Sequence, residues 1–432
     1  MLIPELYNIF LKHPKVITDT RKITKGAIFF ALKGDNFNGN SFASQALSEG
    51  ASFAIIDEAQ YAQNDNYILV NNVLSTLQQL ASYHRQQLNF PVIGLTGSNG
   101  KTTTKELINS VLSQKFKTSA TLGNLNNHIG IPLSLLSIPC DTQIAIIEMG
   151  ANHQKEIEML SNICQPTHGL ITNVGKAHLE GFGGFEGVKK GKGELYNYLE
   201  KAGATVFINN DNPHLIEMMG NKVFKQTITY GTQANNFLQG ELLSNNPFLK
   251  VKWQSASFTS SVQSHLTGSY NFDNLLVAIA MGVYFGLAAD EINAGIQNYM
   301  PENNRSQILK TNKNTLISDY YNANPSSMLA AIQNLKELAA PKKIAILGDM
   351  FELGDATEAE HQHIIEAAMA CNFDECIFIG VQFVNASKSA KAIFFNTTKQ
   401  AQNYLQTNPL HDALILLKGS RGMQLETLVN YM

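Results

Sequence analysis

Residues Thr96 to Thr103 read TGSNGKTT and combine two glycines, a lysine and threonines in the spacing of a phosphate-binding loop. Without side chains at Gly97 and Gly100, backbone N–H groups can close around phosphate oxygens. Lys101 can then reach the β- and γ-phosphates, and the hydroxyl of Thr102 is suited to bind Mg²⁺. The pattern predicts a site for ATP or GTP made of Gly97, Ser98, Asn99, Gly100, Lys101, Thr102 and Thr103.

The elements on either side of this loop must hold it in place. Residues 91–95 are typical of a short buried strand, and residues 101–114 place their leucine, isoleucine and valine side chains on one side of a helix. Leu95 stands where the first glycine of the usual pattern would fall, so an ordinary glycine turn with an exposed lysine is the alternative. The strand and the helix favour the phosphate site.

Two further side chains follow predicted strands and belong to the same sheet edge as the loop. Glu148 ends an apolar strand, where a carboxylate is costly to bury unless it is paired or bound to a metal ion. With Thr102 and phosphate oxygens it would form a Mg²⁺ site, and capping of the next helix is the alternative. His178, close to Glu180, would bind a second metal ion or a transferred phosphate, or serve as a structural partner.

Lys192 belongs to a cluster with Lys189 and Lys190, and most such lysines face water. Beside a metal centre, a lysine held neutral can instead carry CO₂ as a carbamate, which replaces a cation with an oxygen ligand. The spacing of the lysines does not decide between the two.

Two polar groups are hard to explain as loops alone. Asn271 and Asn274 lie three residues apart, on one face of an apolar helix that we expect to continue to Ala289, and helix capping would account for one of them. Residues 319–325 (DYYNANP) gather an acid, two aromatic rings and two amides at a strand end, where ordinary turn chemistry is the alternative.

Composition limits the classes of protein. The chain has 432 residues, 44% of them hydrophobic and 16% charged, which is typical of a globular protein of about three domains. A net charge of −3 argues against a general nucleic-acid binder. The four cysteines form no C-x-x-C pair, the N-terminus lacks the pattern of a signal peptide, and the longest apolar stretch, 275–289, is too short to span a bilayer. We therefore expect a cytoplasmic protein.

The pattern of strands and helices predicts an α/β fold of three domains. Residues 1–82 form a small α/β unit, and 83–302 form a central P-loop ATPase domain with a parallel sheet and an antiparallel excursion over 231–266. Residues 303–432 form a Rossmann-like α/β unit without a glycine fingerprint, which is suited to supply substrate-binding loops. The cleft between the second and third domains is the expected active site.

The ordered set of motifs TGSNGKTTT, EMG, NVGKAHLEGFG and KGEL resembles the ATP-dependent Mur ligases of peptidoglycan synthesis, and the resemblance covers essentially the whole chain. Residues 319–325, 348–354 (GDMFELG) and 418–421 (KGSR) are most similar to members that add D-alanyl-D-alanine to UDP-N-acetylmuramoyl-tripeptide. Asp19, Thr20 and Arg21 resemble a D-S-R motif of the family's UDP-sugar domain, with threonine in place of the usual serine, and Asn38-Gly39-Asn40 stands where Asp-Gly-His is common.

The resemblance implies a reaction in which ATP phosphorylates the tripeptide carboxylate and the dipeptide amine displaces phosphate. Lys101, His178 and a carbamylated Lys192 are the implied catalytic residues, and Mg²⁺ is implied at Thr102, Glu148, His178 and Lys192. Asn271 and Asn274 are implied to hold the adenine, and Arg305 and Asp319 to contact the nucleotide. The implied substrate contacts are Asp19, Thr20 and Arg21 for the UDP-sugar, Asn126 and Asn127 for the acceptor, and Tyr321, Asn322 and Asn324 for the dipeptide.

Two other functions compete with this one. A sister ligase would add the third amino acid or a folate glutamate, and residues 319–325 argue against it. A nucleotide switch of the P-loop class would ligate nothing and would leave the polar groups of the third domain unexplained. We expect a monomer with no nucleic-acid partner and no membrane span.

Overall fold

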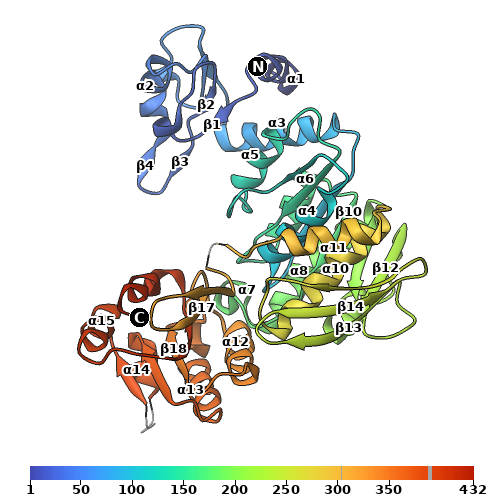
Figure 1. Ribbon diagram of the computed structural model, residues 1–432. Coiled ribbons are helices and arrows are strands. Elements are labelled where there is room, and N and C mark those ends of the chain that lie inside the picture. The colour runs from blue at the N-terminus through green and yellow to red at the C-terminus, as the bar shows by residue number, and fades with distance from the viewer. Residues whose placement is uncertain (303, 388–391) are drawn as a thin grey trace.

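The computed structural model describes residues 1–302, 304–387 and 392–432. Three lobes follow one another along the chain, with the N-terminal lobe at the top of Figure 1, the central lobe on the right and the C-terminal lobe at the lower left. Each lobe contains its own main sheet. The chain therefore has the expected three-domain α/β architecture.

The N-terminal lobe is built on a four-stranded parallel sheet in the order β1-β2-β5-β6, with a separate hairpin of β3 and β4. Its elements are α1 (Ile3–Lys12), β1 (Val16–Ile17), η1 (Thr20–Lys22), β2 (Ile28–Phe30), β3 (Lys33–Gly34), β4 (Phe37–Asn38), η2 (Gly39–Phe42), α2 (Ala43–Ser48), β5 (Phe53–Ile56), η3 (Ala59–Tyr61), β6 (Tyr67–Leu69) and α3 (Val73–Gln86). The boundary expected after residue 82 falls inside α3, whose apolar face packs on both the first and the second domain.

The central domain is a nine-stranded sheet in the order β15-β14-β13-β12-β11-β10-β7-β9-β8. Its elements are β7 (Val92–Thr96), α4 (Lys101–Leu112), β8 (Thr118–Ala120), α5 (Gly130–Leu136), β9 (Ile144–Glu148), α6 (Glu156–Cys164), β10 (His168–Ile171), α7 (Leu179–Phe182), α8 (Phe185–Lys201), β11 (Thr205–Asn209), α9 (Pro213–Met219), β12 (Gln226–Gly231), β13 (Leu238–Asn245), β14 (Leu249–Gln254), β15 (Thr259–Gln263), η4 (Ser269–Asn271), α10 (Phe272–Tyr284) and α11 (Ala289–Asn298).

Strands β8 to β13 run parallel, and β14 and β15 complete the sheet in antiparallel fashion. The antiparallel excursion is thus confirmed, although it extends the main sheet rather than forming one of its own. In β14 the chain's only tryptophan, Trp253, is fully buried, and its indole N–H donates to Asn293 Oδ1 at 3.0 Å.

The expectation of one helix continuing to Ala289 was wrong. Helix α10 ends at Tyr284, and α11 begins at Ala289 after a short turn. Gly286 has a φ of +75°, a left-handed conformation that ends helices and that glycine adopts at little cost. Among the described residues no helix is long and apolar enough to cross a membrane.

The C-terminal domain has a six-stranded sheet in the order β16-β17-β21-β18-β19-β20, parallel except for the edge strand β16. Its elements are β16 (Gln307–Lys310), β17 (Thr315–Asp319), α12 (Pro325–Glu337), β18 (Lys343–Gly348), η5 (Gly354–Ala356), α13 (Thr357–Met369), β19 (Glu375–Ile379), α14 (Val381–Ala386), β20 (Ile393–Phe395), α15 (Thr398–Thr407), β21 (Leu414–Lys418), η6 (Arg421–Met423) and η7 (Leu425–Tyr431). The expected start of this domain, residue 303, lies outside the described residues.

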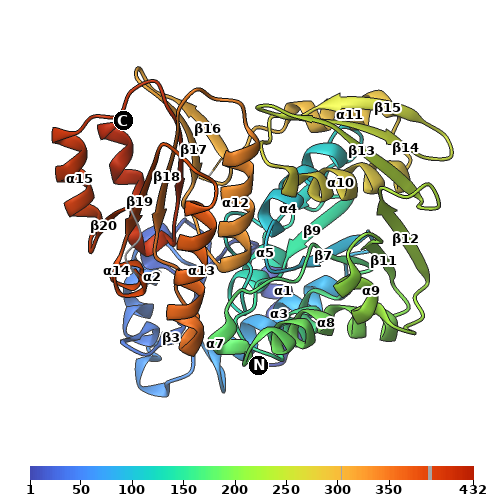
Figure 2. The same ribbon diagram turned by 90° about the horizontal axis from the view of Figure 1, so that it is seen from below.

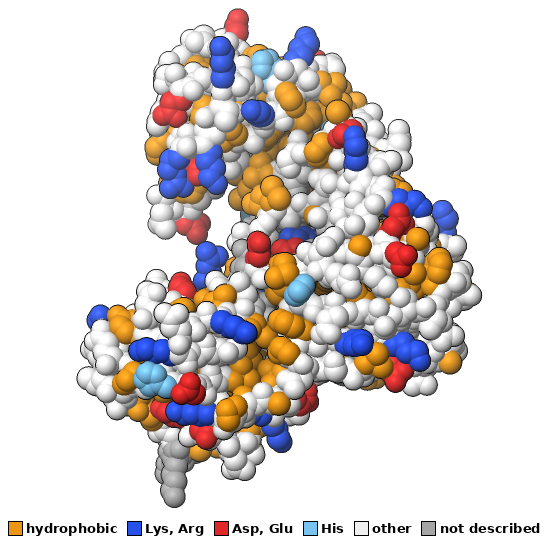
Figure 3. Space-filling view, viewed as in Figure 1, with side chains coloured by type: hydrophobic (Ala, Val, Ile, Leu, Met, Phe, Trp, Pro, Cys, Tyr) orange, Lys and Arg blue, Asp and Glu red, His pale blue; other side chains and the backbone are white. Residues whose placement is uncertain are grey.

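Viewed from below, helix α12 of the C-terminal domain lies beside the edge of the central domain at which α4 begins (Figure 2). The surface is hollowed between the N-terminal and C-terminal lobes (Figure 3). The fold thus brings the C-terminal domain close to the phosphate-loop candidate.

Candidate active site

A cavity of about 690 Å³ lies between the central and C-terminal domains. Most residues singled out from the sequence line it: Ser98, Asn99, Gly100, Lys101, Thr102, Thr103, Asn126, Asn127, Glu148, His178, Asn271, Asn274, Arg305, Asp319, Tyr321, Asn322 and Asn324. Gly97, Lys192, Asp19, Thr20 and Arg21 do not line it. One cavity therefore gathers groups that are spread along the chain from residue 98 to residue 418.

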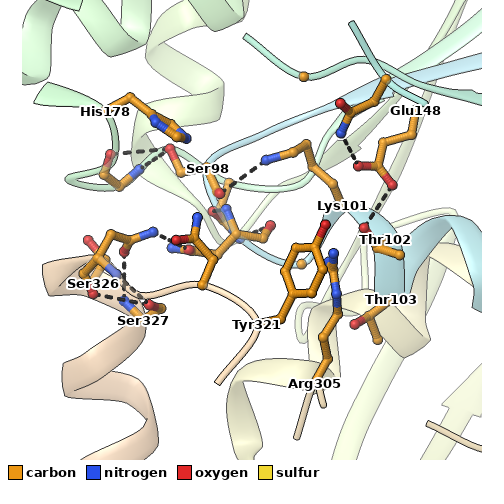
Figure 4. A pocket seen from close by; sticks show the side chains of 18 of the residues that line it. Ser98, Lys101, Thr102, Thr103, Glu148, His178, Arg305, Tyr321, Ser326 and Ser327 are labelled. Atoms are coloured by element: carbon orange, nitrogen blue, oxygen red, sulfur yellow. Dashed lines mark hydrogen bonds between the residues drawn. The ribbon is translucent and has the colours of Figure 1, made fainter. Parts of the chain in front are cut away.

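The loop between β7 and α4 has the shape that the glycines predict. Gly97 and Gly100 have φ values of +152° and +76°, and a Cβ on Gly97 would meet Thr172 Oγ1 at 2.0 Å. Lys101 Nζ donates to the carbonyl oxygens of Gly97 (2.7 Å) and Ser98 (3.2 Å), so its ammonium is folded back onto the loop (Figure 4). Burial lowers the pKa of Lys101, an effect that the nearby Glu148 carboxylate opposes.

Glu148 points at this loop from the end of β9. It is 1% exposed, and its two carboxylate oxygens accept hydrogen bonds from Thr102 Oγ1 (2.9 Å) and Asn126 Nδ2 (2.7 Å), as Figure 4 shows. The alternative of helix capping is wrong, because the N–H groups at the start of α6 donate to Glu194 instead. A buried carboxylate beside a threonine hydroxyl is a suitable pair of ligands for a hard cation.

His178 faces the cavity from the start of α7, in a left-handed conformation with φ of 52°. Its Nδ1 contacts the carboxylate of Glu352, which comes from the C-terminal domain. Burial lowers the pKa of His178, while Glu352 acts in the opposite direction. The net effect on His178 favours the neutral ring.

Lys192 is 1% exposed, so it does not face water as most lysines do. Its Nζ donates to the carbonyl of Ala151 at 3.1 Å and lies 5.0 Å from the centre of the Phe182 ring. Burial, and then the charge of Lys101, hold the pKa of Lys192 well below its usual value. A lowered pKa favours the unprotonated amine, which is the form that can react with CO₂.

Asn271 and Asn274 form a buried relay rather than helix caps. Thr104 Oγ1 donates to Asn274 Oδ1 (3.0 Å), Asn274 Nδ2 donates to Asn271 Oδ1 (2.9 Å), and Asn271 Nδ2 donates to the carbonyl of Thr267 (2.8 Å). The capping alternative is wrong, since neither side chain accepts from a backbone N–H of the first turn of α10. The relay ties this wall of the cavity to helix α4.

The C-terminal domain contributes a cationic and aromatic wall. The guanidinium carbon of Arg305 lies 3.9 Å from the centre of the Tyr321 ring, and that of Arg421 lies 5.6 Å from the same ring centre. Asp319 Oδ2 accepts a hydrogen bond from Lys418 Nζ at 2.7 Å. Asn322 keeps its side chain local, accepting from the N–H of Ala323 at 2.9 Å.

Asn324 serves both in the local turn and in a contact with the phosphate loop. Its Oδ1 accepts from the N–H of Ser327 (2.9 Å) and caps α12, while its Nδ2 donates to Asn99 Oδ1 of the loop (2.7 Å). The turn chemistry of residues 319–325 therefore also joins the two domains.

The sequence reasoning located the motif that contains Asn173 but gave that residue no role of its own. Asn173 follows a buried strand at the same sheet edge as Glu148, and it accepts from the N–H of Asn99 at 3.0 Å. Ser326 lines the cavity and was missed; its Oγ accepts from the N–H of Lys176 at 2.9 Å. Ser326 and Glu352 carry no sequence signal for their partners, which are 150 and 174 residues away.

The UDP-sugar candidates lie in the N-terminal lobe. Asp19 accepts two hydrogen bonds from the Arg21 guanidinium, at 2.9 and 2.8 Å, and caps the short helix η1. The Arg21 side chain is exposed. The hollow of Figure 3 separates this lobe from the C-terminal one.

Family models match nearly the whole chain. Residues 95–282 match the Mur ligase middle domain, 304–421 the glutamate ligase domain of Mur ligases, and 15–89 the Mur ligase family catalytic domain. The chain belongs to the Mur ligase family. This membership and the ligase relatives below agree with the family resemblance of the motifs.

Relatives with assigned activities cover the chain from end to end. The UDP-N-acetylmuramoyl-tripeptide--D-alanyl-D-alanine ligase of Bacillus subtilis is 36% identical over 96% of this chain and 92% of its own length. The enzyme of the same name from Escherichia coli is 34% identical over the same shares. A crystal structure of MurF from Acinetobacter baumannii superposes with a TM-score of 0.86 at 31% identity, over 96% of this chain and 92% of that one.

Proposed function

We propose that this Mur ligase joins D-alanyl-D-alanine to UDP-N-acetylmuramoyl-tripeptide and converts ATP to ADP and phosphate. The observation that carries the proposal is the cavity in which the phosphate loop faces the Asp319–Asn324 segment of the C-terminal domain. Relatives that share this chain's full length carry the same activity in their names. A nucleotide switch would have no use for the second wall.

In the proposed reaction, the terminal carboxylate of the tripeptide attacks the γ-phosphorus of ATP and forms an acyl phosphate. The dipeptide amine then attacks the acyl carbon, and phosphate leaves as the amide forms. Lys101 turns from the carbonyls of Gly97 and Ser98 to the phosphates and offsets the charge that gathers there. Asn126 and Asn127 hold the acceptor, and Tyr321, Asn322 and Asn324 hold the dipeptide.

The nucleotide takes its contacts from both domains in this proposal. The loop residues 97–103 hold the phosphates, Asn271 and Asn274 face the adenine, and Arg305 and Asp319 close over it from the C-terminal side. The Nε of Arg305 is buried without a hydrogen-bond partner among the described residues, as expected for a group that awaits a ligand.

The residues present fit Mg²⁺. Thr102 and Glu148 offer oxygen ligands, and His178 and a carbamylated Lys192 would hold a second ion. Within the described residues no three His, Cys, Asp or Glu side chains converge as a metal site, and phosphate oxygens would supply further ligands. When bound, the metal neutralises developing negative charge on the phosphates.

A phosphate-release assay tests the proposal. With ATP, Mg²⁺, UDP-N-acetylmuramoyl-tripeptide and D-alanyl-D-alanine, we expect release that stops when any one component is omitted, and mass spectrometry should find the pentapeptide product. Release that depends on a single free amino acid would indicate a sister ligase. Slow release that no amine accelerates would indicate a nucleotide switch. We place this reaction in the cytoplasm, where ATP and UDP-linked precursors occur, and we propose a monomer.

Closure of the N-terminal lobe toward the other two domains is part of the proposal, because the UDP-sugar candidates lie outside the cavity that holds the phosphate loop. We expect the radius of gyration from small-angle scattering to fall when a non-hydrolysable ATP analogue and the acceptor are both added. Identical profiles with and without both ligands would reject closure.

A further inference from the structure

Helix α7 of the central domain is docked onto the loop that follows β18 in the C-terminal domain. Glu352 places its carboxylate on His178 Nδ1, and its carbonyl accepts from the N–H of Glu180 at 3.4 Å. A Cβ on Gly354 would lie 3.3 Å from that of Glu180. His178 and Glu180 therefore dock on one loop, and Leu179 between them packs on apolar clusters of both domains.

The loop that carries Glu352 is itself firmly held. Asp349 accepts from the N–H groups of Gln382 and Phe383, both at 3.0 Å, and the N–H of Met350 donates to His361 Nε2 at 3.1 Å. Glu352 adopts a left-handed conformation, with φ of 61°. The GDMFELG stretch, which the proposed function leaves without a role, thus builds a rigid mount for one carboxylate.

That carboxylate decides which imidazole nitrogen carries the proton. A neutral histidine donates from one nitrogen and accepts at the other, and the partner of the first fixes the roles of both. With Nδ1–H directed at Glu352, the lone pair of His178 is on Nε2. His178 lines the cavity and extends toward the side of Lys101 in Figure 4.

We propose that Glu352 is a positioning residue that fixes the tautomer and orientation of His178, so that the central domain's histidine is prepared only when the C-terminal domain is docked. The inference rests on the proposed function for its purpose. Carboxylates that orient a metal-binding histidine in this way typically change metal affinity 10- to 100-fold when removed. Docking of the C-terminal domain would therefore also prepare His178 for its role at the phosphates.

If Glu352 only held the two domains together, a different result would be expected, and Glu360 provides a matched control. Glu360 of the same domain pairs with Lys176 Nζ at 2.5 Å, two residues before His178, without touching the histidine. If Glu352 served only to hold the domains together, its loss and the loss of Glu360 would have like effects.

The test reads the tautomer of His178 directly, by long-range ¹H–¹⁵N NMR on the full-length apo enzyme at pH 7.5, with His178→Asn to assign the signal. We expect the Nδ1–H tautomer in the unaltered enzyme and in Glu352→Gln, whose amide oxygen still accepts. We expect a mixture of tautomers in Glu352→Ala. Glu360→Ala should leave the signal unchanged.

A second readout is the Mg²⁺ dependence of ADP binding by calorimetry. The Mg²⁺ concentration at half effect should rise about 10-fold or more in Glu352→Ala and less than twofold in Glu360→Ala. An Nε2–H tautomer in the unaltered enzyme, or equal effects of the two alanine variants, would overturn the inference. The tautomer of the unaltered enzyme decides even if Glu352→Ala does not fold. It also decides if the ligase assay fails, so the two proposals can be told apart.

Discussion

The two outer domains are attached to the central one by different physical means. The N-terminal lobe and the central domain share one apolar cluster, in which Leu77 and Leu80 of α3 lie with Ile131 and Leu135 of α5. The C-terminal domain meets the central one mainly through polar contacts, including Asn324–Asn99, Ser326–Lys176, Glu360–Lys176 and Glu352–His178. Leu179 is the notable apolar link at this second interface. We call the interface between the central and C-terminal domains the polar seam, and the one between the N-terminal lobe and the central domain the apolar seam.

This difference shows how one chain can combine a stable frame with an adjustable active site. Burial of apolar area is a large stabilising contribution, whereas a hydrogen bond exchanged with water adds only about 0.5–1.5 kcal/mol net. The polar seam can therefore open for the nucleotide at small cost while the apolar seam stays closed. The binding cavity lies at the seam that opens more easily.

The largest effect on activity is expected at the phosphate loop. Lys101→Ala should lower kcat by about 10³-fold, since a single charge on the transferred phosphoryl group is lost. Among the residues that the structure describes, its amine bonds only to loop carbonyls, so the melting curve followed by circular dichroism should stay close to that of the unaltered enzyme. Ligation that survives this change would remove the phosphate-loop assignment.

A break in the apolar seam should cost stability. Leu77 is fully buried, and Leu77→Ala should lower the free energy of unfolding by about 2–5 kcal/mol in urea titration. The exposed Leu2→Ala, in the same lobe, is the control and should change it little. A loss below about 1 kcal/mol at Leu77 would contradict the view that this seam is a core.

A break in the polar seam should cost less. Ser326→Ala removes the acceptor for the N–H of Lys176 and should lower the free energy of unfolding by about 0.5–1.5 kcal/mol. Because Ser326 also lines the cavity, the KM for ATP should rise at the same time, which steady-state kinetics would show. A stability loss as large as that of Leu77→Ala would erase the distinction between the seams.

The smallest effect is expected at the rim. Lys176 is half exposed but the Glu360 side chain is only 10% exposed, so their ion pair lies at the edge of the interface and should contribute about 0–1 kcal/mol. Glu360→Gln should therefore shift the urea midpoint slightly, and added salt should reduce that shift only in part, because a partly buried pair is screened less than an exposed one. A shift as large as that of Ser326→Ala would contradict this ranking.

Much of this organisation could be predicted from the sequence because it is local. The strand, loop and helix around residues 92–112 follow from apolar runs and two glycines, and the parallel strands of the C-terminal domain follow from apolar runs alone. The edge strands β16 and β20 were missed, because they are short and only half-buried. Helix α10 was drawn too long, because the turn at Gly286 interrupts an unbroken apolar run.

The contacts of the polar seam could not be predicted, because their partners lie far apart in the sequence. Asn324 and Asn99 are 225 residues apart, and a hydrogen bond between two amides leaves no periodic pattern in either segment. Glu352 was visible only as part of a motif, and its partner depends on how two separate sheets meet. Residue type and strand ends located the candidate groups, but only the packed domains show which of them touch.

Trp253 gives the molecule a reporter of its own. It is the sole indole in the chain, it is sealed inside β14, and neither outer domain contains another. Intrinsic fluorescence excited at the red edge therefore follows the melting of the middle domain alone, whereas circular dichroism follows all three. The lag or coincidence of the two signals measures directly whether the lobes unfold together.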